Sequence, residues 1–224
     1  MVVGTVEIMR QPRHLVWDWN GTLLDDLPLV VAATNVAFAA AGGPTITAEE
    51  HRRDFRRPII EYYAQVLGRP VDVTEFAALN KIFHDAYQAK LPCSLTADAR
   101  TALAEWPGSQ SLLSMWFHTE LVPAVAGHGL TPFFQRIDGL REPLEHGGDH
   151  KAPYLAQHLA AQGLSGEQVV MIGDSVDDAH AAAAVGARCV LYTGGFTDEA
   201  QLRATGAPVV DSLRAAVALA RTLP

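Results

Sequence analysis

The sequence has little cysteine, and this shortage excludes two classes of small protein. Its 224 residues include only two cysteines, Cys93 and Cys189, and neither has CxxC or Cys/His spacing. A disulfide framework needs more cysteines, and a zinc site needs ligands at recognisable spacings. The sequence therefore predicts a reduced, cytoplasmic protein.

Basic residues and long apolar runs are also scarce. Lys and Arg number 17 against 25 Asp and Glu, which gives a formal net charge of -8. Nucleic-acid binding usually requires a basic excess, so we expect no nucleic-acid partner and favour a small molecule. The longest apolar runs, near residues 29–33 and 36–41, are far shorter than the roughly 20 residues that cross a bilayer. We expect no membrane span, and the N-terminus lacks the pattern of a cleaved signal peptide.

Short apolar segments rich in β-formers alternate with longer helical patterns. This alternation predicts an α/β fold with a Rossmann-like, doubly wound parallel sheet. The predicted strands are residues 14–17, 111–114, 168–172, 188–192 and 208–210. The predicted helices of this part are residues 152–162, 177–185 and 212–222.

The segment between the first two predicted strands is too long for a simple crossover, and its pattern is helical. It predicts an inserted α-helical cap, with a helix over residues 27–41 and another from Thr74 to about residue 90. Thr47 and Glu50 have the spacing of a capping box. The domain boundaries follow: a core of residues 1–25 and 96–224, and a cap of residues 26–95.

Two acidic clusters stand where predicted strands end. The first strand ends in Asp18, which is followed by Trp19, Asn20, Gly21 and Thr22. Ligands of open α/β sheets gather at the carboxyl ends of strands, and a glycine there leaves backbone amides able to meet an anion. An Asx-turn is the alternative explanation for this segment alone.

The second cluster follows the strand at 168–172 and contains Asp174, Asp177 and Asp178. Carboxylate oxygens suit Mg²⁺, which usually takes one or two carboxylates together with substrate phosphate. Asp177 alone is better explained as a helix-opening residue, so Asp174 and Asp178 are the candidate ligands. The two clusters together favour a phosphate-handling metal site.

At this point the sequence resembles the haloacid dehalogenase-like hydrolases. Their first motif, DxDx(T/V), is similar to residues 18–22, and their second, a strand-end Ser or Thr, to Ser114 in SLLSMW. The third, a basic residue, is similar to Lys151 in GGDHKAPYL, and the fourth, GDxxxD, to residues 173–178. The helical insertion resembles the cap of the phosphoglycolate phosphatase-like branch.

The resemblance implies a mechanism and a set of site residues. Asp18 would attack the phosphoryl group of a small phosphorylated metabolite and become an aspartyl phosphate. A Mg²⁺ ion would be held by Asp18, the backbone carbonyl of Asn20 and Asp174, with Asp178 completing or orienting the metal site. Thr22, Ser114 and Lys151 would bind the phosphoryl oxygens.

Asn20 departs from the family pattern, which usually has a second Asp there as general acid and base. An amide has no proton to transfer near neutral pH, and a missing general acid costs roughly 10² to 10⁴ in rate. We therefore expect slow turnover, another proton carrier, or a substrate with a good leaving group, such as an acyl, anhydride or aryl phosphate. Asp25 and Asp26 are either alternative proton carriers or solvated residues at a helix entry.

The cap offers Arg56 and Arg57 beside aromatic residues, and a guanidinium suits a carboxylate or phosphate on the substrate. Pairing with the nearby acidic residues Glu49, Glu50 and Asp54 is the alternative. Trp19 and Trp116, which follow the first two motifs, either wall the site or pack in the core.

Two other functions stay open. Asn20 is compatible with a phosphate-binding or regulatory protein of weakened activity, and phosphonatases of the superfamily, which cleave carbon-phosphorus bonds, also lack the second Asp. Those relatives use a cap lysine, and the insertion contains only Lys81 and Lys90. Nothing in the sequence indicates an oligomeric state.

Overall fold

The computed structural model describes residues 14–141 and 150–223, and its centre is a parallel sheet. The six strands lie in the order β3-β2-β1-β4-β5-β6, which confirms the predicted α/β class. From β1 the chain builds the sheet outward through β2 and β3, then returns to β4 on the other side of β1. Such a reversal is where open α/β sheets bind ligands. The strands are β1 (His14–Trp17), β2 (Ser109–Phe117), β3 (Arg136–Leu140), β4 (Val169–Gly173), β5 (Arg188–Tyr192) and β6 (Val209–Val210).

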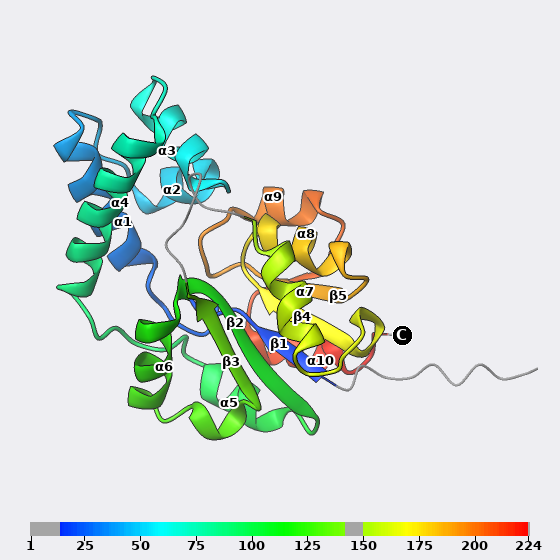
Figure 1. Cartoon of the computed structure of the whole chain (residues 1–224). Helices are drawn as coiled ribbons and strands as arrows, with labels where there is room; N and C mark the ends of the chain where they lie inside the picture. The colour runs from blue at the N-terminus through cyan, green and yellow to red at the C-terminus, as the bar shows by residue number, and fades with distance from the viewer. Residues whose placement is uncertain (1–13, 142–149, 224) are drawn as a thin grey trace, which may run out of the picture.

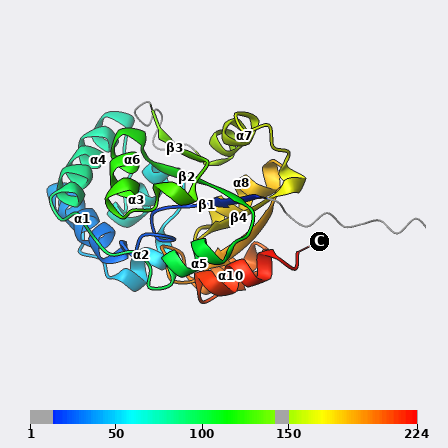
Figure 2. The same cartoon turned by 90° about the horizontal axis from the view of Figure 1, so that it is seen from below.

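Helices cover both faces of the sheet, and Figure 2 shows α7 and α8 on the side opposite α5 and α10. The alternation of side chains along β1 explains the two cores. Leu15 and Trp17 pack with α5 (Ala99–Glu105), α6 (His118–Gly127) and α10 (Leu213–Ala220). Val16 faces α7 (Ala152–Ala160), α8 (Val176–Ala184) and α9 (Glu199–Ala204). Two 3-10 turns, Thr131–Phe133 and Gly166–Gln168, precede β3 and β4.

Between β1 and α5 lie four helices that gather beside the sheet (Figure 1). They are α1 (Leu27–Ala40), α2 (Ala48–Asp54), α3 (Ile59–Leu67) and α4 (Val73–Gln88). Phe38, Tyr62, Tyr63 and Phe76 form the centre of an apolar cluster of their own. The predicted helical insertion is therefore present, with a core separate from those of the sheet.

The ends of these helices confirm one capping prediction and correct another. Thr47 caps α2 in a full capping box with Glu50, as its spacing indicates. The cap assigned to Thr74 is wrong, because α4 begins at Val73 and the Asp72 carboxylate accepts the Glu75 amide. The capping residue is therefore Asp72, two residues before the predicted one.

No helix in the described ranges is long and apolar enough to cross a membrane.

A buried polar network links β1, β2, β3 and α7 inside the second core. The imidazoles of His14 and His158 each place Nε2 2.7 Å from Ser111 Oγ. His158 Nδ1 lies 2.7 Å from Asp138 Oδ2, and His14 Nδ1 lies 2.7 Å from Ser109 Oγ. Burial, aided by the nearby His158, lowers the pKa of His14 to about 4.

Candidate active site

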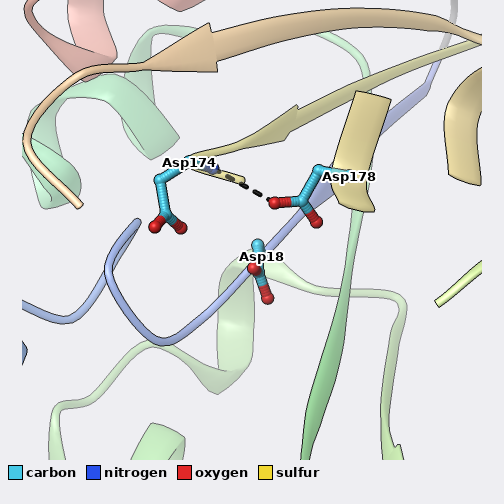
Figure 3. Close-up of side chains that lie close together, drawn as sticks. All are labelled: Asp18, Asp174 and Asp178. Atoms are coloured by element: carbon cyan, nitrogen blue, oxygen red, sulfur yellow. Dashed lines mark hydrogen bonds between the residues drawn. The ribbon is translucent and has the colours of Figure 1, made fainter. Parts of the chain in front are cut away.

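Asp18 and Asp174 follow β1 and β4, which are adjacent strands, so their carboxylates meet at one edge of the sheet. Asp178 joins them from the first turn of α8. Oxygen atoms of the three side chains all lie within 4.8 Å of one another. Figure 3 shows the three carboxylates converging from the two strand ends and the helix. The two acidic clusters of the sequence thus form one site.

Lys151, at the N-terminus of α7, lies inside this cluster and is buried. Its Nζ is 2.9 Å from Asp18 Oδ1 and 2.5 Å from Asp178 Oδ1. Burial lowers the pKa of Lys151, but the Asp178 and Asp18 carboxylates outweigh that effect and raise it above its usual value. One ammonium against three carboxylates leaves the cluster negative when all are ionised.

This excess of negative charge perturbs the aspartates. Burial raises the pKa of Asp18 to about 7; Lys151 opposes the rise and Asp178 adds to it. Burial, followed by the repulsion of Asp18 and Asp178, raises the pKa of Asp174 well above its usual value. Such groups favour a neighbouring cation, because a cation stabilises their ionised forms.

Hydrogen bonds fix the orientation of Asp174 and Asp178. Thr22 Oγ1 donates to Asp174 Oδ1 at 2.6 Å, and the Phe196 amide donates to Asp174 Oδ2 at 2.7 Å. Asp178 Oδ2 accepts the Asp174 amide together with both the amide and the hydroxyl of Ser175. Thr22, predicted as a phosphate ligand, contacts a site carboxylate.

Glycines make room for these carboxylates. A Cβ atom on Gly21 would lie 2.5 Å from Asp174 Oδ2, and one on Gly195 would lie 2.1 Å from the same atom. A Cβ atom on Gly173 would lie 2.4 Å from Asp178. Gly21 also has φ 71°, in the left-handed region that a side chain disfavours. The backbone therefore packs directly against the acidic cluster.

Asn20 is held by two residues that sequence reasoning did not join to it. Its Nδ2 donates to Asp26 Oδ2 at 2.8 Å and to the Tyr87 hydroxyl oxygen at 3.2 Å. Asp26 also accepts the Tyr87 hydroxyl at 2.7 Å and the Gly21 amide at 2.7 Å. Asn20 Oδ1 accepts the Ser114 hydroxyl at 3.2 Å.

Asp26 is fully buried, so the alternative of a solvated helix-entry residue is wrong for it, whereas Asp25 is exposed. Burial raises the pKa of Asp26 to about 6, although its hydrogen bonds with Asn20, Tyr87 and Gly21 favour the ionised form. The short separation of Asp26 from Asn20 in sequence was a usable signal. Tyr87, at the far end of α4, offered none.

A pocket of about 120 Å³ opens between the acidic cluster and the helical insertion. Asp18, Asn20, Ser114, Lys151 and Asp174 line it, so the structure brings these predicted residues together. Asp178 lies behind them.

Of the two predicted cap arginines, Arg57 lines the pocket and lies 3.6 Å from Asp177 Oδ2. Arg56 is exposed, lines a neighbouring hollow and donates to the Asp54 carbonyl. Trp116 lines the pocket, whereas Trp19 is buried in the core of the sheet. The two alternatives drawn for the tryptophans therefore apply to one residue each, and of the two arginines only Arg57 lines this pocket.

Helix α2 is joined to the loop that follows β5. Arg52 donates to the carbonyl oxygens of Gly195 at 2.8 Å and Gly194 at 3.1 Å. The Asp198 amide donates to the Arg52 carbonyl at 3.1 Å. The same loop carries Phe196, whose amide contacts Asp174, so the insertion reaches the acidic cluster through one short segment.

Comparisons with known proteins agree with this geometry. A family model described as HAD-hydrolase-like matches residues 147–216. The phosphoglycolate phosphatase of Caulobacter vibrioides is 31% identical over 199 residues, which cover 83% of this chain and 81% of the relative. The chain belongs to the haloacid dehalogenase-like hydrolases. This hydrolase falls in the phosphoglycolate phosphatase-like branch and is of the phosphatase class, as the sequence motifs predict.

Solved structures give this hydrolase the same fold. A predicted phosphatase from Clostridium acetobutylicum matches with a TM-score of 0.82 at 15% identity, over 96% of this chain and all (100%) of the other. A haloacid dehalogenase-like hydrolase from Streptococcus pneumoniae matches with a TM-score of 0.78 at 21% identity, over 92% and 97% of the two chains.

Proposed function

We propose that this hydrolase removes the phosphoryl group from a small phosphorylated metabolite, with Asp18 as nucleophile and Mg²⁺ as cofactor. The observation that carries the proposal is the cluster of Asp18, Asp174 and Asp178 around Lys151 at the base of the pocket. Phosphoglycolate phosphatase activity of the relatives supports a phosphorylated small molecule as substrate.

Asp18 has the contacts that a nucleophile requires. Its Oδ1 accepts the Trp19 amide at 2.7 Å and lies beside Lys151 Nζ, which leaves Oδ2 the less engaged oxygen. Attack on phosphorus would form an aspartyl phosphate and divide hydrolysis into two easier steps. Lys151 would stabilise the charge that gathers on the phosphoryl oxygens, and Ser114 would donate a hydrogen bond to one of them.

The residues of the cluster fit a hard divalent cation. Three carboxylates share one ammonium, and burial with mutual repulsion raises the pKa of Asp18 and of Asp174. We propose that Asp18, Asp174 and the backbone carbonyl of Asn20 would hold Mg²⁺, with Asp178 orienting them and Lys151. A bound Mg²⁺ ion would offset the repulsion between Asp18 and an anionic substrate.

We propose that residues 26–95 act as a cap over a core of residues 1–25 and 96–224. The pocket is lined from both parts, and Arg52 ties α2 to the loop after β5. Arg57 lies in the pocket wall, where its guanidinium would meet a second anionic group of the substrate. Arg56 points to a separate hollow and is the weaker candidate for a substrate ligand.

The geometry gives less support to a phosphonatase. That chemistry needs an amine to form a Schiff base, and among described residues the pocket is lined by one lysine, Lys151, which is paired with carboxylates. Lys81 pairs with Asp85 on the exposed side of α4. A phosphate-binding role without turnover stays the second candidate, because Asn20 occupies the general-acid position.

The test is phosphate release from a panel of phosphate esters, with Mg²⁺ or with a chelator. We expect release that needs Mg²⁺ and is abolished by Asp18→Asn, while Asp25→Asn, an exposed neighbour on the same loop, keeps wild-type rates. Asn20→Asp should raise turnover of esters with poor leaving groups. Binding of phosphate esters with no release from wild type or Asn20→Asp would instead favour the binding role.

A further inference from the structure

The orientation of Asn20 decides what the site offers to a departing group. Both donors of its amide are directed at Asp26 and Tyr87, and its Oδ1 faces Ser114 on the pocket wall. Turning the amide over would set its oxygen against the Asp26 carboxylate and the Tyr87 hydroxyl oxygen. The residue at the general-acid position therefore presents an acceptor to the pocket, and it cannot donate a hydrogen bond to a leaving oxygen.

Asp26 does not line the pocket, and three groups that do line it and carry a transferable proton are engaged elsewhere. Tyr87 lines the pocket but donates its hydroxyl to Asp26. His84 Nε2 lies 2.7 Å from Glu120, and the imidazole stacks on Trp116 at 5.0 Å between ring centroids. Lys151 is directed at Asp18 and Asp178. A leaving group must then depart as an anion.

Much of the pocket wall is aromatic. It includes Phe55, Phe83, Tyr87, Trp116, Phe117 and Phe196. The whole pocket, including the space beside Asp18 and Lys151, measures about 120 Å³, so it has room for one small ring at most, as a roughly 150 Å³ apolar cavity accepts one benzene. Aromatic edges and faces of this kind favour a flat apolar ring. A short hydrophilic alcohol such as glycolate would gain little from them.

We propose that the substrate is an aryl phosphate, a single ring joined to phosphorus through a phenolic oxygen. This assignment rests on the proposed phosphatase function and adds the class of leaving group. An aryl phosphate explains both the missing proton donor at Asn20 and the aromatic lining of the pocket. A phenolate departs without a proton donor, and its ring can pack against aromatic side chains.

Hydrolysis of the aryl phosphate would proceed in two steps. Asp18 forms a bond to phosphorus as the bond from phosphorus to the phenolic oxygen breaks, and the electron pair leaves with that oxygen as phenolate, which takes a proton from solvent. Water then attacks the phosphorus of the aspartyl phosphate and loses a proton to solvent. Inorganic phosphate leaves, and the Asp18 carboxylate is restored.

The first test compares phenyl phosphate with benzyl phosphate, which has the same ring but a far more basic leaving oxygen, and with phosphoglycolate. We expect kcat/KM for phenyl phosphate to exceed that for benzyl phosphate by roughly 10² or more, the rate that a general acid would supply. The ratio of kcat/KM for phenyl phosphate to that for benzyl phosphate should fall in Asn20→Asp.

The second test separates recognition of the ring from chemistry. Phe83→Ala should raise KM for phenyl phosphate several-fold and leave KM for acetyl phosphate, which has no ring, unchanged. Val73→Ala, an exposed position on the same helix α4, is the matched control and should change neither.

The tests distinguish failure of the phosphatase function from failure of the aryl assignment. No Asp18-dependent release from any ester would overturn the phosphatase function itself. Release that depends on Asp18 but is equal for phenyl and benzyl phosphate, or greatest for phosphoglycolate, would overturn only the aryl assignment. A phosphotyrosyl peptide cleaved faster than phenyl phosphate would also overturn it, because the proposed substrate is a free small molecule.

Discussion

At the scale of single residues, the site depends on three glycines, which have no side chain, as much as on its charged groups. Gly21, Gly173 and Gly195 leave the space that the carboxylates of Asp174 and Asp178 occupy. A methyl group at any of them would have to displace an oxygen of the acidic cluster. These glycines are thus part of the site although they contribute no side chain.

Gly21→Ala should therefore weaken Mg²⁺ binding. We expect a loss of roughly 1 to 2 kcal/mol in the free energy of unfolding from the left-handed backbone alone, and at least a tenfold weaker Mg²⁺ affinity from displacement of Asp174. Gly42→Ala is the matched control, since Gly42 has φ 69° but nothing within 4 Å of a Cβ atom. Calorimetric titration with Mg²⁺ and urea unfolding measure the two effects. Equal Mg²⁺ affinity in the two variants would contradict this account.

Sequence reasoning found the acidic cluster because Asp18, Asp174 and Asp178 stand in local motifs directly after apolar strands. Parallel strands place their carboxyl ends at one edge, so the convergence followed from the pattern. Asp26 and Tyr87 were not predicted as partners of Asn20. Asp26 is close to Asn20 in sequence, whereas the contact of Tyr87 depends on where the far end of α4 packs, which no local spacing encodes. Arg56 and Arg57 are adjacent in sequence, and only the turn before α3 decides that Arg57 enters the pocket.

At the scale of elements, the contact between α2 and the loop after β5 couples the insertion to the acidic cluster. Arg52 holds the carbonyls of Gly194 and Gly195, and the next residue, Phe196, donates to Asp174. One segment of the chain therefore both holds α2 on the core and orients the carboxylate of Asp174.

Arg52→Ala should loosen this contact and affect the site at a distance. We expect a several-fold rise in KM for phosphate esters and faster proteolysis between α1 and α4, because two charge-assisted hydrogen bonds are lost. Arg53→Ala is the control, since Arg53 is exposed and pairs with its neighbour Asp54. Identical kinetics and proteolysis in the two variants would show that α2 is held by other contacts.

The accuracy with which the strands were predicted depends on how continuous their apolar runs are. β1 and β5 have the predicted bounds, since continuous apolar runs mark buried parallel strands. β2 extends beyond residues 111–114 at both ends, where polar and aromatic residues interrupt the pattern. β3 was missed because Asp138 and Gly139 break its short apolar run; in the structure it pairs with β2, and Asp138 is buried beside His158.

At the scale of the whole molecule, the buried histidine network makes stability depend on pH. The pKa of His14 is about 4 in the folded protein against 6.5 for an exposed imidazole. The unfolded chain therefore binds the extra proton first, and the stability that neutral His14 contributes is lost as pH falls from about 6.5 toward 4.

His14→Gln should remove this dependence while keeping a neutral side chain. Between pH 7 and pH 5 we expect the free energy of unfolding of the wild type to fall by about 2 kcal/mol more than that of the variant. Urea unfolding of both proteins in the presence of a chelator measures the difference in the free energy of unfolding. The opposite contributions of the buried aspartates are present in both proteins and cancel. Parallel pH profiles would mean that His14 is protonated or solvated in the native protein.

The sheet order also fixes when the site can exist during folding. β1 is the first described strand of the chain, yet it lies at the centre of the sheet between β2 and β4. Its partner β4 is made only after the whole insertion, β2, β3 and the helices α5, α6 and α7. Pairing across such a separation requires closure of a long loop, which is a slow kind of contact to form. Until β4 arrives, the nascent chain has an unpaired edge on β1 and an Asp18 without Asp174 or Asp178. The hydrolase therefore assembles its acidic cluster late in synthesis, when β4 pairs with β1.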